Sequence, residues 1–354
     1  MKKNIVKLLL SVFASFTAAV SLTASTFAYV LINNKAVVST FDFEIHGTEG
    51  LEISLDNRHW SQDILASQIK EQLIKNTEYQ SFDDIQFNCT TIAQENGLIK
   101  KDENNQIKFN YLEVEGEFDD NLQKNVYHHI EKEAKANSDK GYIKFDLYFR
   151  SKSTYKEKSE YVLKTTENTK ITSDLKSVRV GNRLTTKDMD DFNEYKDYNP
   201  GEYVNVDISN AIRLGIYNVD MDDEGNFTNY HDFNIYEMPN EKDLGSVALE
   251  SHRGLKDIYD PEVNAMYTYY NSYFTKYPFE SGALDGEAFI TQNRESLLNN
   301  EFGSFVYNET NNEYNVVKLE FYIWLEGWDA DYFTGVPEGT QVSVDLEFEM
   351  LKKE

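Results

Sequence analysis

Cysteine and proline are both scarce in this chain. It contains one cysteine, Cys89, and 5 prolines in 354 residues. A single cysteine excludes any intrachain disulfide, so the fold cannot be a small disulfide-stapled module and must depend on its hydrophobic core. Cys89 follows Phe87 in a strand-like context, which favours a plain buried thiol over a reactive one. Few prolines together with 24 Tyr and 22 Phe predict a packed, strand-forming chain.

Positive charge is also in short supply. The chain has 35 Lys and Arg against 61 Asp and Glu, a formal net charge of -26. Such a surface repels phosphate backbones, and nucleic acid is therefore not expected among the partners. High solubility is the commoner reason for this much negative charge.

Catalytic motifs are missing from the sequence. No pair of the six histidines has the HExxH spacing that places two imidazoles over zinc. The adjacent His128 and His129 would point about 100° apart on a helix. The sequence has no GxSxG elbow and no phosphate-binding glycine loop, and Cys89 lacks the flanking signature of a thiol protease. We therefore predict a protein that is not an enzyme and that needs no cofactor.

The N-terminal region has the layout of an export signal. Three lysines within the first seven residues precede an apolar, uncharged run over 8–32. Small residues before Tyr29 predict a signal peptide over 1–28, cleaved after Ala28. An uncleaved anchor is the alternative, because about 20 apolar residues can cross a bilayer, and residues 8–32 would then be the only membrane contact. Either way we expect an extracellular or cell-surface protein.

Alternating apolar and polar residues recur along the mature chain, most clearly at its C-terminal end. Residues 317–325 and 342–348 each alternate with a period of two, and we expect them to form half-buried strands that pair antiparallel. In the first of them, Lys318, Glu320, Tyr322 and Trp324 fall on the outer face. Further strands are expected at 41–45, 51–55, 107–111, 142–149, 203–208, 212–216 and 233–236.

Two segments have apolar residues at four-residue spacing, which predicts helices. They are 61–75, with Leu65, Ile69 and Leu73, and the segment after Asp119, with Leu122, Val126, Ile130 and Ala134. With many strands and no strand-helix-strand rhythm, the expected fold is mainly β. It is an antiparallel two-sheet sandwich over 29–354, with a few packed helices and an elaborated insertion at about 221–312.

An acidic stretch near the start of that insertion resembles the beginning of a calcium loop. Asp220, Asp222 and Glu224 present alternate carboxylates before Gly225. The closing glutamate is missing, because the twelfth position is His231. The sequence therefore leaves open a weak calcium site and a polar turn between two strands.

The segment 326–333 is the most distinctive in the chain, because it combines carboxylates with aromatic rings. Trp328 and Tyr332 lie beside Asp329 and Asp331. Three hypotheses follow: a structured loop at a strand end, a glycan-binding platform on which Trp328 stacks against a sugar ring, and a glycosidase pair of acids. Sequence proximity does not fix the separation of the carboxylates that the last of these requires.

Residues 26–43, TFAYVLINNKAVVSTFDF, resemble the junction between signal and first strand in the TasA and camelysin-like family of bacterial matrix and surface proteins. Three more segments are similar to a set found in related exported proteins: 50–54 with Trp60 downstream, 209–213, and 324–329. This chain departs from the family in Ala24 and Ser25, where members have glycine, and in its large insertion. It also supplies no zinc constellation for the protease activity attributed to camelysin-like members.

The resemblance implies a jelly-roll-like sandwich and assembly into extracellular fibres. An N-terminal extension, here Tyr29 to about Thr40, would complete a sheet of the next subunit by strand addition. Val37, Val38, Phe41 and Phe43 would then make the subunit contacts. The leading hypothesis is a secreted or cell-surface structural or adhesive protein whose partners are itself or related surface subunits. The alternative is an extracellular glycan-binding module that uses the loop 326–333.

Overall fold

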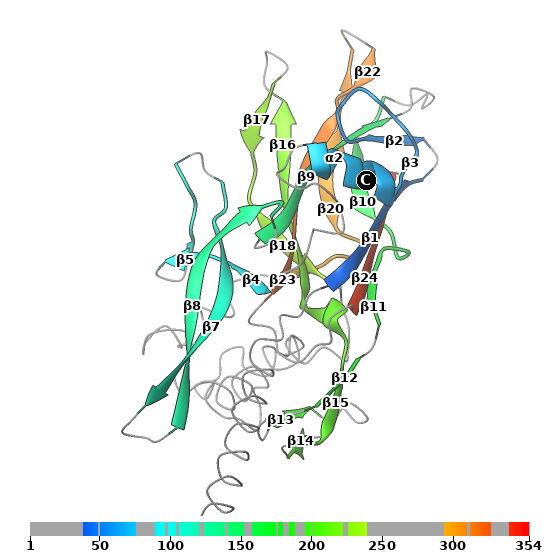
Figure 1. Ribbon diagram of the computed structural model, residues 1–354. Helices are drawn as coiled ribbons and strands as arrows, with labels where there is room; N and C mark the ends of the chain where they lie inside the picture. The colour runs from blue at the N-terminus through cyan, green and yellow to red at the C-terminus, as the bar shows by residue number, and fades with distance from the viewer. Residues whose placement is uncertain are drawn as a thin grey trace, which may run out of the picture.

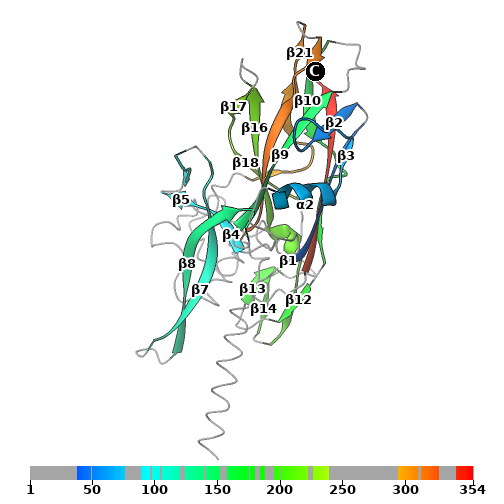
Figure 2. The same cartoon turned by 45° about the horizontal axis from the view of Figure 1, so that its top comes forward.

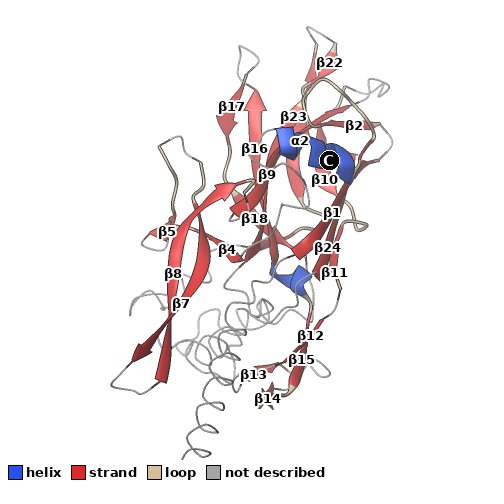
Figure 3. Cartoon of the chain, viewed as in Figure 1, coloured by secondary structure: helices blue, strands red, loops and turns tan. Residues whose placement is uncertain are grey.

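The described part of the chain is mainly β, as the sequence predicts (Figure 3). The computed structural model describes residues 38–48, 50–75, 89–95, 98–103, 106–119, 124–138, 141–151, 158–174, 176–179, 184–187, 195–199, 201–221, 226–238, 294–309, 312–326 and 340–353. The predicted signal peptide over 1–28 and the apolar run over 8–32 lie outside these ranges. Within the ranges, no helix is both long enough and apolar enough to span a membrane.

A six-stranded sheet contains both the first and the last strand of the described chain. Its order is β20 (Glu301–Phe305), β10 (Tyr161–Thr165), β24 (Thr340–Lys352), β1 (Val38–Gly47) and β3 (Asp63–Ile64), and β11 (Lys170–Ser173) also pairs with β24. β1 and β24 run side by side and parallel from the Val38–Thr340 pair to the Gly47–Phe348 pair (Figure 1). The other pairings in this sheet are antiparallel.

A ten-stranded sheet is built around β23 (Val317–Glu326). On one side β23 pairs with β16 (Ile212–Met221), which leads to β17 (Phe227–Tyr230), β18 (Asn234–Glu237) and β19 (Arg294–Ser296). On the other side lie β9 (Gly141–Ser151) with β2 (Leu51–Ser54), and β4 (Cys89–Ile92) with β7 (Phe109–Asp119) and β8 (Lys124–Ala136). The pairs β4–β23, β8–β9 and β18–β19 are parallel.

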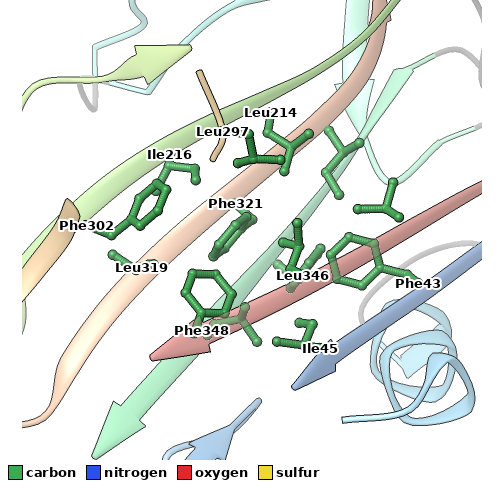
Figure 4. Packing of buried hydrophobic residues seen from close by; sticks show 14 of the residues in the cluster. Phe43, Ile45, Leu214, Ile216, Leu297, Phe302, Leu319, Phe321, Leu346 and Phe348 are labelled. Atoms are coloured by element: carbon green, nitrogen blue, oxygen red, sulfur yellow. The ribbon is translucent and has the colours of Figure 1, made fainter. Parts of the chain in front are cut away.

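The main core lies between these two sheets. Phe348 from β24 packs near Phe321 from β23, with ring centroids 6.4 Å apart (Figure 4). The Phe348 ring also lies near that of Phe149 from β9, with centroids 4.8 Å apart. Ile69 and Leu73 of α2 (Ala66–Lys75) are buried in the same cluster, which confirms the first predicted helix, although Leu65 is exposed. Burial of these apolar side chains is the main stabilising contribution to such a fold.

A second, smaller core forms because the larger sheet closes on itself. β23, β4, β7, β8 and β9 form a ring, since β9 pairs with both β8 and β23. Figure 2 shows the long β7–β8 pair of this ring, with β4 near it. Each strand of the ring contributes to the aromatic cluster of this second core: Trp324, Tyr322, Ile92, Phe109, Ala134 and Tyr142. Gly141 permits the closure, because a Cβ there would lie 1.7 Å from the Lys135 carbonyl oxygen.

This closure corrects the expected architecture. The expected sandwich was antiparallel, but both sheets are mixed and one of them curls into a five-stranded ring. The predicted pairing of 317–325 with 342–348 is also wrong, because β23 and β24 belong to different sheets and face each other across the core. Both segments are strands with the predicted alternation; their partners come from distant parts of the chain.

The second predicted helix is a strand. Val126, Ile130 and Ala134 lie in β8, which pairs antiparallel with β7 from Phe109–Ala134 to Asp119–Lys124. A spacing of four residues fits one face of a helix, but it is also a multiple of two and fits one face of a strand. Pairing with β7 decides between them. His128 and His129 are therefore strand residues, opposite Glu115 and Val114 in the register.

The remaining expected strands are found, with small shifts at their ends. The segments near 41–45, 51–55, 107–111, 142–149, 212–216 and 233–236 correspond to β1, β2, β7, β9, β16 and β18. The segment 203–208 divides into β15 (Tyr203–Val206) and the short helix η2 (Ile208–Ala211). Of the predicted insertion 221–312, the described residues are largely strands: β17 to β19, β20 and β21 (Tyr307–Asn308).

Candidate functional site

The predicted ligand-binding loop begins where β23 ends. Glu326, the last residue of β23, is buried and accepts a hydrogen bond from the indole Nε1 of Trp324 at 3.0 Å. Trp324 is fully buried in the second core, so it packs inside the protein as the structured-loop hypothesis expects. The four residues predicted to bind a ligand, Trp328, Asp329, Asp331 and Tyr332, lie outside the described residues.

The predicted calcium segment begins within β16, which contains Asp220. β16 ends at Met221 and β17 begins at Phe227, and the two pair antiparallel. The Asp220 carboxylate is exposed and contacts the His231 ring nitrogen Nε2 at 2.6 Å. Asp222 and Glu224 lie outside the described residues. In the described ranges, no group of three or more His, Cys, Asp or Glu side chains is arranged to hold a metal ion.

The predicted subunit-contact residues belong to β1 or directly precede it. Val38 and Phe41 lie opposite Thr340 and Val342 of β24, whereas Val37 lies outside the described residues. Phe43 is 2% exposed and packs edge-to-face on Phe145, with ring centroids 5.3 Å apart. In this chain, therefore, β1 completes its own sheet, and Phe43 anchors it in its own core.

A layer of charged and aromatic side chains covers the second face of β23, where sequence alternation predicted a solvent face. All ten residues of the strand are buried. Glu320 is 4% exposed and accepts hydrogen bonds from the Lys144 ammonium at 3.0 Å and from the Tyr322 hydroxyl at 2.5 Å. Lys318 pairs with the Asp146 carboxylate at 2.8 Å. Glu320 and Lys318 thus each have an opposite charge beside them, as burial of a charge requires.

The electrostatics of this layer follow from burial next to carboxylates. Burial first, and then the negative charge of Glu320, raise the pKa of Tyr322 and that of Tyr217. The same causes, with Asp102 and Glu133, raise the pKa of Tyr142 to about 12. These hydroxyls therefore stay protonated at physiological pH, and the Tyr322 hydroxyl donates a hydrogen bond to the Glu320 carboxylate.

A pocket of about 440 Å³ opens beside this layer, lined by residues that precede β7 and by residues of β7, β8 and β9. Asp102, Glu103, Gln106 and Glu133 provide most of its polar lining, and the Phe109 and Tyr142 rings stack on each other in its wall with centroids 4.0 Å apart. Lys108 is the one cation among the described lining residues, and its ammonium lies 3.9 Å from the Glu133 carboxylate. An acidic rim beside an aromatic wall suits a polyhydroxylated or cationic ligand.

A second group of charges joins four neighbouring strands of the six-stranded sheet. The His46 ring of β1 contacts Asp63 of β3 through Nδ1 at 2.9 Å. Its Nε2 lies 3.6 Å from Glu44 of β1 and 3.5 Å from Asp345 of β24. Asp345 also contacts the Lys170 ammonium of β11 at 3.4 Å. Cations and carboxylates therefore alternate across β11, β24, β1 and β3.

Sequence reasoning missed both charged groups. His46 lies seventeen residues from Asp63 and almost the whole chain from Asp345, so its neighbours depend on the pairing of strands. One signal was present on β23, because alternation did place Lys318, Glu320, Tyr322 and Trp324 on one face. What periodicity does not reveal is that a second core covers this face.

Comparison with protein-family models, with curated proteins and with solved structures gave no match. The similarity of residues 26–43 to the TasA and camelysin-like junction therefore stays an expectation from sequence.

Proposed function

We propose that this chain is a secreted or cell-surface structural or adhesive protein that assembles with copies of itself, or with related surface subunits, by strand addition. The observation that carries the proposal is the parallel pairing of β1 with β24, in which the first described strand completes a sheet beside the last one. Such pairing supplies affinity through main-chain hydrogen bonds and specificity through alternate side chains that fit the core.

The position at which β1 begins supports this assignment. Val38 lies opposite Thr340, the first residue of β24, so β1 begins at the end of the sheet where β24 begins, and the extension 29–37, which lies outside the described residues, is attached there. An extension attached there is in position to continue along a neighbouring subunit instead of crossing its own core. Phe43 and Ile45, both buried, anchor the following part of β1 to its own subunit. The anchored strand and the preceding extension would then link one copy to the next.

The test is assembly as a function of concentration. Light scattering and sedimentation of the purified protein should show multimers that grow with concentration and disappear when residues 29–37 are deleted, while the circular dichroism of the sheets is unchanged. As a control, scrambling 29–37 with its composition kept should also reduce assembly, because strand addition depends on the order of apolar residues. A protein that remains monomeric at high concentration would rule out assembly. Sequencing the N-terminus of protein from medium and from membranes tests export and the cleavage after Ala28.

A second function, binding of extracellular glycans, is favoured by the pocket at the ring. Its carboxylates and the Gln106 amide can bond sugar hydroxyls, and the wall beside Phe109 carries the Tyr142 ring. A glycan array with wild type, Trp328→Ala and Tyr142→Ala separates the two proposed locations. Loss in the first variant places binding in the loop 326–333, and loss in the second places it in the pocket. No binding by wild type excludes this function.

A further inference from the structure

We propose that His46 is a pH-dependent latch that holds the N-terminal strand β1 to its two neighbours, and that the latch is closed when the imidazole is charged. The basis is geometric. The ring of His46 lies among three carboxylates from three strands: Glu44 of β1, Asp63 of β3 and Asp345 of β24. The consequence of the latch for assembly rests on the function proposed above; the latch itself is a property of a single subunit.

The two ring nitrogens have different roles. Nδ1 lies 2.9 Å from the Asp63 carboxylate, and an ionised carboxylate can only accept, so Nδ1 carries a proton and donates it. In the neutral ring Nε2 then has a lone pair. That lone pair faces the Glu44 and Asp345 carboxylates at 3.6 and 3.5 Å, which is an unfavourable arrangement. Protonation of Nε2 turns both contacts into attractions, and the one to Asp345 joins β1 to β24.

The groups around His46 determine the direction in which its pKa is shifted. Partial burial lowers the pKa of His46, but the hydrogen bond to Asp63 and the negative charges of Asp345, Asp63 and Glu44 outweigh it, and the net pKa is raised above 6.5. Lys170 on β11 lies on the far side of Asp345. Glu347 lies opposite His46 in the register, and its carboxylate accepts hydrogen bonds from Thr166 and Asn168.

The pH window follows from that shift. A group whose pKa is higher in the folded state stabilises the fold fully below its unfolded value, here about 6.5, and the stabilisation is lost as pH rises through the folded value. The latch is therefore fully closed below about pH 6.5 and opens as the pH rises through the raised pKa of the folded state. When the latch opens, β1 is held less tightly to β24. A strand from another copy then competes more effectively for the position of β1 in the sheet.

The experiment is amide hydrogen exchange of β1, measured at dilute protein and corrected for the intrinsic pH dependence of exchange. Protection of the amides from Phe43 to Gly47 should fall about two- to fivefold between pH 6 and pH 8, the range given by a partly exposed charge pair. His46→Gln should show the low protection at both pH values, and His46→Lys, which stays charged, the high protection at both. His231→Gln is the matched control, because His231 pairs within one hairpin, and it should behave as wild type.

Two results would overturn the latch. One is an equal pH dependence of β1 protection in wild type and His46→Gln. The other is an NMR titration in which the His46 ring has a pKa at or below 6.5. Because both measurements are made on monomers, they stand whether or not the protein assembles. Multimers that form without any change in β1 protection would support strand addition and reject the part that the latch is proposed to play in assembly.

Discussion

Removal of the Glu320 carboxylate gives the sharpest test of the charged layer on β23. Glu320 is 4% exposed and bonds to both Lys144 and Tyr322. A hydrogen bond to a charged group contributes about 1.5–3 kcal/mol, and breaking a fully buried pair costs about 3–5 kcal/mol. The Lys144 side chain is 26% exposed and also bonds to the Gln106 oxygen at 2.6 Å. Loss of Glu320 should therefore cost no more than the lower end of the range for a fully buried pair. We expect Glu320→Ala to lower the free energy of unfolding by about 2–3 kcal/mol.

Urea unfolding at pH 7, followed by the fluorescence of the buried Trp324, measures the loss. Glu320→Gln keeps an acceptor and should cost about 1 kcal/mol. Glu133→Gln is the control, because that side chain is 74% exposed and its ion pair with Lys108 is 3.9 Å long. It should change stability by less than about 0.5 kcal/mol. If Glu320→Ala behaves like this control, or if Lys144→Met and Glu320→Gln add without coupling, the layer does not stabilise the fold as argued.

Three more expectations follow from the fold. Gly141→Ala should destabilise the ring by about 1–3 kcal/mol and increase amide exchange in β8 and β9, because its Cβ would lie 1.7 Å from the Lys135 carbonyl oxygen; unchanged exchange would refute the ring closure. Phe348→Ala should cost about 3–5 kcal/mol in urea unfolding, and a loss under about 1 kcal/mol would contradict the packing between the two sheets. Hydrogen bonds from the backbone and ring of His59 lower the pKa of Asp56. Protection of the His59 amide from hydrogen exchange should therefore be retained above pH 4 and lost as the pH falls further. Asp56→Ala should remove this protection at every pH.

Local patterns were enough to predict the strand content and the faces of the strands. The alternation in 317–325 and 342–348 identified β23 and β24 and their inward residues correctly. The alternation did not predict that the second face of β23 is buried. A strand with a core on each face still alternates when charged and aromatic side chains cover one of those faces. Burial of Glu320 depends on Lys144, which is supplied by β9 from far away in the sequence.

Pairing and closure could not be predicted in the same way. Neighbouring strands in the sequence are the simplest partners, which is why β23 and β24 were expected to pair; β24 instead pairs with β1, β10 and β11. The segment of β8 was ambiguous, since four-residue spacing satisfies both helix and strand. For the candidate site, the latch around His46 depends wholly on such long-range pairing, whereas residues 328–332 of the predicted ligand loop lie outside the described residues.

The pairing of β1 with β24 also affects when the protein can finish folding. β1 is synthesised long before β24, because most of the sequence lies between them. Until β24 is made, Phe43 and Ile45 have no completed sheet to pack into. A delay of this kind slows folding, as expected when contacts join distant parts of a chain. Under the function proposed above, the same interval would leave a nascent copy open to a strand from a folded one.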